Sequence, residues 1–206
     1  MNRIMDVDEF VADTPVDLVR GRRGAAGPTW TDLRVLLTLL KAHRPVRCLE
    51  VGIHRGHTAR LLLDHAPSIE HYVGIDRTPE RAKIIAGELV CDDPRVELLI
   101  TETGTRSMHS ADIPHAPFDW IFIDSNHSYG GVKFDTEFVQ PLLAPGAILV
   151  WHDYGVPSQF SPGTKPFGVT PYLDEWEGEP PITTFMDPPH SSSIAFQRFG
   201  GEGAAT

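Results

Sequence analysis

The chain lacks the sequence features of membrane, secreted and nucleic-acid-binding proteins. No stretch approaches the ~20 uninterrupted apolar residues that span a bilayer, and the N-terminus soon becomes acidic, unlike a secretory signal. The chain has 18 basic residues against 28 acidic ones, and its net charge of -10 would repel a phosphate backbone. We therefore expect a cytoplasmic protein with no nucleic-acid or membrane partner.

Cysteine is also scarce. Cys48 and Cys91 are the two cysteines, and both lie in or beside apolar runs, where a free thiol behaves as a small buried hydrophobe. We expect neither to be catalytic. Apolar residues make up 41% of the 206 residues and charged residues 22%, which is typical of one globular domain.

The sequence does contain an alternation of short apolar strands and longer amphipathic helices. Strands are predicted at residues 46–51, 71–75, 95–100, 118–123 and 147–151, and helices at residues 30–42, 56–65, 79–90, 129–142 and 171–176. Two late runs, 181–186 and 192–199, predict an antiparallel hairpin at the C-terminal edge. The pattern is typical of α/β proteins, and we expect a Rossmann-like, doubly wound, mostly parallel sheet of seven strands.

We expect a single domain over residues 1–206, with an N-terminal arm at 1–28 and a flexible tail at 200–206. Residues 155–171 are rich in Pro, Gly, Ser and Thr, and loops of this length in compact domains tend to cover or bind substrates. Aromatic residues surround this predicted lid loop. Together with the N-terminal arm, they make a homodimer the expected assembly.

Polar residues stand at the predicted strand ends. Glu50 lies near the end of the first strand, Asp76 follows the second, Asp124 follows the fourth, and His152 and Asp153 follow the fifth. In a doubly wound sheet, ligands bind beyond the carboxyl ends of the strands, where the strand order reverses. We therefore expect the functional site at this edge.

The turn after the first strand suits a nucleotide-bearing cofactor. Gly52 permits a tight turn and a close backbone approach, and Gly56 lets the next helix begin against the sheet. Ile53 and His54 stand where a dinucleotide fingerprint would need glycine, which disfavours nicotinamide and flavin dinucleotides. Asp76 is placed to accept both ribose hydroxyls. The two features imply an adenosine ligand without a pyrophosphate.

Several segments resemble a known family. The sequences CLEVGIHRGHT at 48–58 and YVGID at 72–76 resemble the first two motifs of class I S-adenosylmethionine-dependent methyltransferases. The sequence FDWIFIDSNHSYGGVKFD at 118–135, with LLAPG at 142–146 and WHDY at 151–154, is similar to small-molecule O-methyltransferases that act on macrolide sugars and other glycosides. The resemblance covers residues 30–154 and implies methyl transfer from S-adenosylmethionine to a hydroxyl of a small sugar or glycoside.

The resemblance also implies residue roles. On the cofactor side, Glu50 would lie near the methionine end, Gly52, Gly56 and Thr58 would form the cofactor loop, Asp76 would hold the ribose, and Glu102 and Thr103 would lie near the adenine. On the acceptor side, Asp124 and Asp153 would bind a divalent cation, and His127 would be the general base.

The chemistry of the reaction agrees with a cation and a base. A sugar hydroxyl is a poor nucleophile near neutral pH, so a Lewis acid that lowers its pKa assists the attack, and an imidazole can accept the proton. Oxygen ligands suit Mg²⁺, with Mn²⁺ as the alternative. His152 departs from the family pattern, which commonly has a carboxylate there. It is either a third ligand, which would favour a borderline metal, or a support for the loop.

Two other hypotheses stay open. One is a metal-independent O- or N-methyltransferase in which His127, or His152 with Asp153, is the general base. The other is a non-catalytic nucleotide-binding module that keeps the cofactor loop but has no use for the acceptor-side residues. Asp135, on the helix after the fourth strand, is expected to form a structural pair with a basic neighbour.

Overall fold

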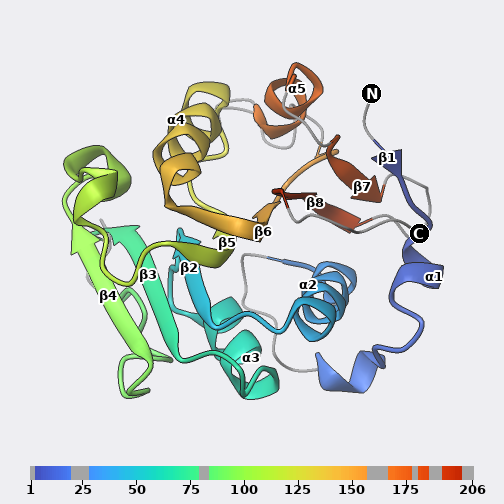
Figure 1. Ribbon diagram of the computed structural model, residues 1–206, viewed down its shortest axis with the longest axis horizontal. Helices are drawn as coiled ribbons and strands as arrows, with labels where there is room; N and C mark the ends of the chain where they lie inside the picture. The colour runs from blue at the N-terminus through green and yellow to red at the C-terminus, as the bar shows by residue number, and fades with distance from the viewer. Residues whose placement is uncertain are drawn as a thin grey trace.

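The protein is built on an eight-stranded sheet with the strand order β1-β7-β8-β6-β5-β2-β3-β4 (Figure 1). The computed structural model describes residues 3–19, 28–78, 84–156, 167–177, 181–185 and 192–200. The strands are β1 (Arg3–Ile4), β2 (Arg47–Val51), β3 (His71–Arg77), β4 (Val96–Thr101), β5 (Phe118–Ile123), β6 (Leu143–Trp151), β7 (Thr183–Phe185) and β8 (Ser192–Arg198). The predicted lid loop and tail lie largely outside the described residues.

Helices cover both faces of the sheet. The α-helices are α1 (Val7–Phe10), α2 (Trp30–His43), α3 (His57–His65), α4 (Tyr129–Val139) and α5 (Val169–Asp174), and short 3-10 helices occupy Val16–Leu18, Gly104–Ser107, Ser110–Asp112 and Gln140–Leu142. Helices α2 and α3 pack on one face, and α4 and α5 on the other (Figure 1). Among the described helices, none has both the length and the apolarity to cross a bilayer.

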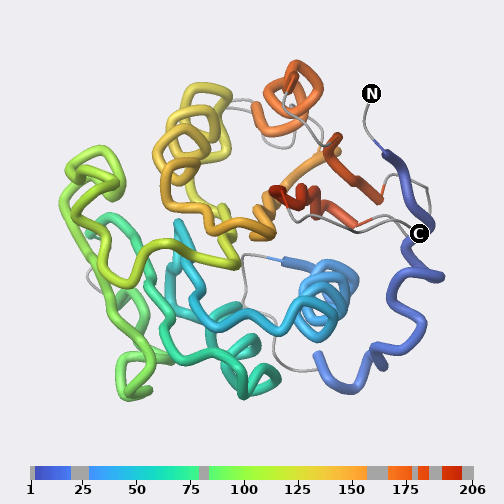
Figure 2. Tube along the Cα trace, in the orientation of Figure 1, coloured from blue at the N-terminus to red at the C-terminus, as the bar shows by residue number. Residues whose placement is uncertain are grey.

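The topology confirms the expected α/β class and the antiparallel hairpin. Strands β2 to β6 are mutually parallel, and β8 runs antiparallel to both β6 and β7. The predicted number of seven strands was wrong by one. The arm contributes β1, which pairs in parallel with β7 through the Arg3 and Met5 amides (Figure 2). A two-residue strand is too short to leave an alternating pattern in the sequence.

The helix predicted at 79–90 was also wrong in its described part, since residues 84–90 contain turns and no helix. Gly87 has a φ of 70°, a left-handed conformation that does not continue a helix. The amides of Gly87 and Leu89 donate to the carbonyls of His54 and Arg55, at 2.7 and 3.0 Å. This segment therefore supports the loop after β2.

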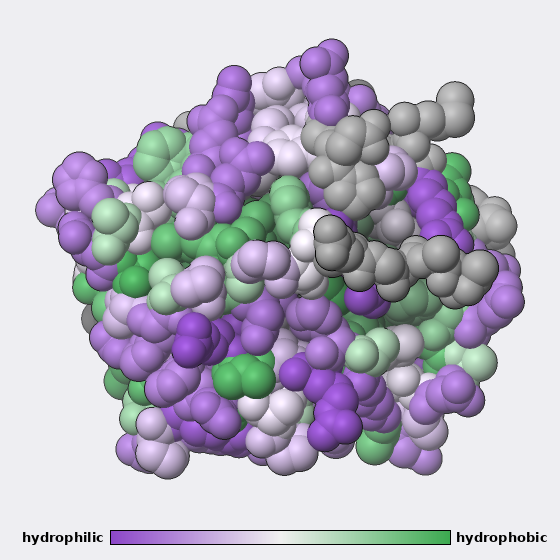
Figure 3. Space-filling model, in the orientation of Figure 1, coloured by the Kyte–Doolittle hydropathy of each residue, from purple (hydrophilic) through white to green (hydrophobic). Residues whose placement is uncertain are grey.

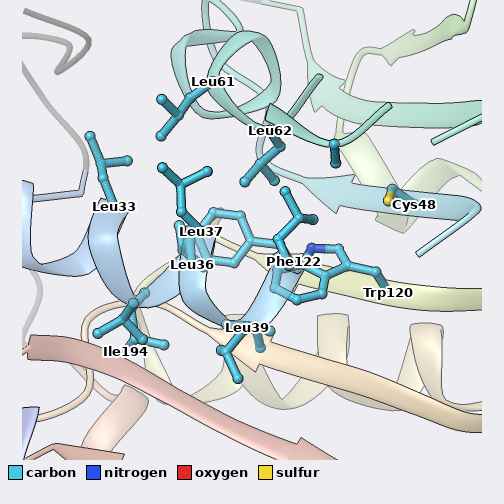
Figure 4. Close-up of a cluster of buried hydrophobic side chains, with 14 of the residues drawn as sticks. Leu33, Leu36, Leu37, Leu39, Cys48, Leu61, Leu62, Trp120, Phe122 and Ile194 are labelled. Atoms are coloured by element: carbon cyan, nitrogen blue, oxygen red, sulfur yellow. The ribbon is translucent and has the colours of Figure 1, made fainter. Parts of the chain in front are cut away.

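The core on the α2 face explains why that helix forms where it does. Thr29 and Asp32 make a reciprocal capping box at its start, and Arg44 ends it in a left-handed conformation. Its leucines pack against Leu61 and Leu62 of α3 and against Trp120 and Phe122 of β5 (Figure 4). Removing this apolar surface from water is the main force that holds the helix on the sheet.

Hydrophilic residues are the more abundant on the face shown in Figure 3, and apolar residues are exposed between them. Cys48 is buried in the α2-face core, as expected, whereas Cys91 is exposed, which corrects the prediction that both thiols are buried.

Gly52 is the position where the sheet and the site depend most on glycine. Its φ is 97°, and a Cβ there would lie 2.2 Å from the carbonyl oxygen of Asp124 and 2.7 Å from the Cα of Ser125. The close approach joins the loops that follow β2 and β5. Both loops carry predicted site residues.

Gly52→Ala should therefore destabilise the protein. A left-handed L-residue costs about 1–2 kcal/mol, and the contact with Asp124 adds to this, so Tm should fall by roughly 5 °C or more. Gly130→Ala is the matched control, because a Cβ there meets nothing within 4 Å. Differential scanning calorimetry of both variants makes the comparison. If Gly52→Ala melted at the same temperature as Gly130→Ala, the close contact between the loops after β2 and β5 would not require glycine at position 52.

Candidate functional site

The loop between β2 and α3 curls around the carboxylate of Asp76. Gly52 donates its amide to the Ile75 carbonyl at 2.8 Å, and His54 donates its amide to Asp76 Oδ2 at 2.6 Å. The other oxygen, Oδ1, accepts the Arg77 amide at 2.7 Å. His54 has a φ of 46°, and holding a non-glycine residue in the left-handed region stores strain in the loop.

A cavity of about 550 Å³ opens at the carboxyl edge of the sheet. It lies between the loop after β2, the end of β3, the segment after β4, the loop after β5 and α4. The predicted site residues in its lining are Gly52, Asp76, Thr103, Asp124 and His127. The structure thus brings one glycine, the two carboxylates of different strands and the predicted base to one space.

Four predicted cofactor residues lie outside this lining: Glu50, Gly56, Thr58 and Glu102. Glu50 is buried and accepts a hydrogen bond from the Tyr72 hydroxyl at 2.7 Å. Burial raises its pKa well above the ordinary value, and Asp124 and Asp76 add to the shift. Gly56, with a φ of 89°, precedes α3, and Thr58 is buried in its first turn.

A second group of polar residues lies where β5 and β6 end. The His152 amide donates to the Ile123 carbonyl at 3.1 Å, which continues the pairing of the two strands and places His152 beside Asp124. His152 Nδ1 lies 3.0 Å from Asp124 Oδ1 and 3.3 Å from Asp153 Oδ1. One ligand atom of each of the three residues lies within 4.8 Å of the others. Two carboxylates and an imidazole at this separation suit a divalent cation.

Electrostatics at this group favours charged forms. Burial lowers the pKa of His152, but Asp124, Asp153 and Asp32 outweigh it and raise that pKa well above its ordinary value. Burial likewise opposes the ionisation of Asp153, yet His127 and His152 hold its pKa well below the usual range. The negative charges of the neighbouring carboxylates thus outweigh the effect of burial on His152.

His127 lies beside this group in the loop before α4. Its Nδ1 is 2.6 Å from Asp153 Oδ2, and its ring meets the edge of Phe167 with centroids 4.9 Å apart. The Gly168 amide donates to the His127 carbonyl at 2.6 Å. These contacts connect the loops before α4 and α5 and fix the orientation of the imidazole.

Asp32 is a residue of this site that sequence reasoning missed. It lies in the first turn of α2, is fully buried, and its Oδ2 is 3.6 Å from His152 Nε2. Burial opposes its ionisation, but His152, Ser192 and Thr29 lower its pKa to about 2. The sequence around Asp32 signals a helix cap and nothing more, since its partners are 120 and 160 residues away.

Asp135 differs from expectation in its partners. It accepts hydrogen bonds from the hydroxyls of Thr105, at 2.5 Å, and Ser125, and its nearest polar contacts are not basic side chains. Burial raises its pKa. Asp135 also lines the cavity, together with Arg106, whose guanidinium lies over the Phe134 ring at 4.5 Å from its centroid. Sequence reasoning assigned no site role to either residue.

The fold and the cofactor-loop geometry define a Rossmann-like protein with a nucleotide-type cofactor site. Comparisons with solved structures agree with this fold. The O-methyltransferase TomG from Streptomyces achromogenes, in complex with SAM, is 18% identical, with a TM-score of 0.61 over 94% of this chain and 91% of that chain. A putative caffeoyl-CoA O-methyltransferase from Staphylococcus aureus is 17% identical, with a TM-score of 0.66 over 94% and 97%.

A larger relative in fold is the MycE methyltransferase of the mycinamycin biosynthetic pathway, in complex with Mg and SAH. It is 15% identical, with a TM-score of 0.55 over 97% of this chain and 55% of that chain. No curated protein sequence matches significantly. A family model described as a methyltransferase domain matches residues 49–154, more than half of the chain. The chain therefore belongs to this methyltransferase family and is a class I S-adenosylmethionine-dependent methyltransferase, with the fold of O-methyltransferases.

Asp76→Ala should weaken cofactor binding. A carboxylate that accepts ribose hydroxyls contributes charge-assisted hydrogen bonds, so the Kd of S-adenosylhomocysteine should rise by roughly 10- to 100-fold. Isothermal titration calorimetry measures this Kd. Asp112→Ala is the control, because it removes one exposed carboxylate away from the cavity and should leave the Kd unchanged. An unchanged Kd for Asp76→Ala would show that the ribose lies elsewhere.

Proposed function

We propose that this protein is a divalent-metal-assisted O-methyltransferase that transfers the methyl group of S-adenosylmethionine to a hydroxyl of a small sugar or glycoside, with His127 as the general base. The observation that carries the proposal is the convergence of Asp124, His152 and Asp153 next to His127 at the edge of the cavity. The family membership supplies the methyl-transfer part.

Asp124, His152 and Asp153 are the residues that would hold the cation. Their donor set of two carboxylates and one imidazole fits a divalent ion, with Mg²⁺ or Mn²⁺ as candidates. The bound ion would supply Lewis acidity to the acceptor hydroxyl. Asp124 itself lines the cavity, so the cation side and the acceptor side adjoin.

Asp153 would serve two neighbours with its two oxygens. Oδ1 faces the candidate cation ligands, and Oδ2 contacts His127 Nδ1 at 2.6 Å. If Nδ1 carries the proton of this contact, Nε2 of His127 is the free basic nitrogen. His127 would then take the proton of the acceptor hydroxyl at Nε2, while Phe167 shields one edge of its ring from water.

Gly52, Asp76 and Thr103 form the part of the cavity that would hold S-adenosylmethionine. The cofactor supplies an electrophilic methyl group. The bare backbone of Gly52 would allow its close approach, and Asp76, already fixed by the His54 and Arg77 amides, would bind the ribose without reorganisation. The loop after β2 would be supported by residues outside the cavity lining, namely Glu50, Gly56 and Thr58. Glu102 would lie near the adenine.

A small hydroxylated acceptor fits the remaining lining. The cavity lining also carries Arg106, Asn126 and Asp135, which offer hydrogen bonds of both kinds to a polyol. MycE, a relative in fold, has been solved with Mg, SAH and mycinamycin VI. The cytoplasmic location and the homodimer stay predictions. Ile4, 65% exposed at the outer strand of the sheet, offers apolar surface for such a contact.

A metal-independent methyltransferase is the second candidate. One observation favours it: His152 Nδ1 lies within 3.3 Å of both Asp124 and Asp153, so an imidazolium can take the place of a cation between them. In that case His127 would act on a hydroxyl or amine with no Lewis acid.

Asp124→Ala distinguishes the two candidates. Loss of the Lewis acid costs several kcal/mol of transition-state stabilisation, so kcat should fall by at least about 10²-fold, and excess EDTA should do the same to the wild type. The Kd of S-adenosylhomocysteine should stay within about threefold, since Asp124 is not a ribose contact. Turnover is measured with labelled S-adenosylmethionine and an acceptor found in a panel of glycosides. Full activity of the variant in EDTA would establish the metal-independent reaction.

His127→Ala should lower kcat by about 10²–10⁴-fold, the usual contribution of a general base, with the Kd of S-adenosylhomocysteine unchanged. Added imidazole should restore part of the rate, because a free base can enter the space that the side chain leaves. Methyl transfer is followed with and without imidazole. A variant that keeps its rate, or one that imidazole does not rescue, would assign His127 a structural role.

A further inference from the structure

A buried carboxylate connects the candidate cation site to a part of the chain that the family model does not match. Asp32 lies in α2, outside residues 49–154, and is fully buried. Its Oδ1 accepts the Ser192 hydroxyl at 2.6 Å and the Ser193 amide at 2.7 Å. Its Oδ2 accepts the Thr29 amide at 2.7 Å and the Thr29 hydroxyl at 2.6 Å. Four donors fix this carboxylate in position.

The fixed carboxylate faces His152. Oδ2 of Asp32 lies 3.6 Å from His152 Nε2, while Nδ1 on the opposite side of the ring faces Asp124 and Asp153. Nε2 is buried and has no partner within hydrogen-bond distance among the described residues, and it faces the Asp32 carboxylate at 3.6 Å. The ring itself is buried, with the Phe122 ring at its edge. Each ring nitrogen of His152 therefore faces at least one carboxylate.

The helix cap alone does not explain this arrangement. A capping box requires the Asp32 side chain to accept the Thr29 amide, which occupies only Oδ2. The cap would form equally well at a solvent-exposed helix start, without burial, without Ser192 and without an imidazole. A neutral imidazole that binds a metal through one nitrogen keeps a proton on the other, and a carboxylate at that proton fixes the tautomer and strengthens the ligand.

We propose that Asp32 is a positioning residue that holds His152 with its proton on Nε2, so that Nδ1 is the third ligand of the cation site, and that this nitrogen makes the site prefer Mn²⁺ to Mg²⁺. The inference rests on the cation site of the proposed function. It adds a residue from α2 and a metal preference. Imidazole nitrogen is a better ligand for Mn²⁺ than for Mg²⁺, which gives the preference its direction.

The experiment measures metal binding to the whole protein, with Mn²⁺ and Mg²⁺ alone as probes. Calorimetry gives both Kd values, and pulsed electron paramagnetic resonance of the Mn²⁺-loaded protein detects a coordinated histidine nitrogen. The expected results are a nitrogen signal that is kept in His127→Ala and lost in His152→Ala, and a Kd for Mn²⁺ that rises 10- to 100-fold in Asp32→Asn. His152→Asp should shift the preference towards Mg²⁺ by at least about tenfold.

Thr29→Val is the matched control for the cap. It removes one hydroxyl that donates to Asp32 Oδ2 and leaves the charge facing His152, so it should lower Tm and raise the Kd for Mn²⁺ several-fold at most, far less than Asp32→Asn. If Asp32→Asn does not fold, Ser192→Ala replaces it. That change frees Oδ1 and leaves the cap, and a several-fold rise in the Kd is expected.

Three results would overturn the proposal. The wild type could show no nitrogen signal, or folded Asp32→Asn or Ser192→Ala could have an unchanged Kd for Mn²⁺. The third result is a Kd for Mn²⁺ that rises as much in Thr29→Val as in Asp32→Asn. If Asp124→Ala abolishes Mn²⁺ binding while the Asp32 and His152 variants bind normally, only this inference fails. If the wild type binds neither ion, the inference fails together with the metal part of the proposed function.

Discussion

Several acidic side chains lie close together at the carboxyl edge of the sheet, and each one contacts a hydrogen-bond donor or an imidazole. Two unit charges of one sign about 4 Å apart repel by roughly 4 kcal/mol at an effective dielectric constant of 20, so a group of bare carboxylates would open the edge. Glu50 accepts the Tyr72 hydroxyl, Asp76 is held by backbone amides, and Asp124 and Asp153 lie against the imidazoles of His152 and His127. These contacts offset the repulsion between the carboxylates.

The sequence predicted the location of these residues at the sheet edge where a strand precedes them. Asp76 and Asp124 follow apolar runs whose pairing in a parallel sheet leaves little freedom in where they end. Gly52 was predicted from the same logic, and its contact with the Asp124 carbonyl gives the steric reason. The two carboxylates lie in one cavity lining because β3 and β5, the parallel strands on either side of β2, end at the same edge.

What the sequence could not predict depends on tertiary contacts. The helix expected at 79–90 has a suitable pattern, but Gly87 and Leu89 give their amides to the loop after β2, and this pairing replaces helical turns. Strand β1 is too short to show a period and forms only because β7 offers it an edge. Asp32 has the local pattern of a helix cap, and its second role appears only when β8 and β6 place Ser192 and His152 beside it.

The position of Asp32 has a consequence for how the site is assembled. The serines that fix its Oδ1 belong to β8, and β8 pairs with β6, the strand that directly precedes His152. The C-terminal hairpin and the start of α2 thus meet the residues of the cation site at one point. Ser192 and Ser193 of β8 therefore help to hold in place the carboxylate that faces His152. A cation that binds the three ligands would in turn stabilise that edge, since ligand binding to the folded state alone shifts the folding equilibrium towards it.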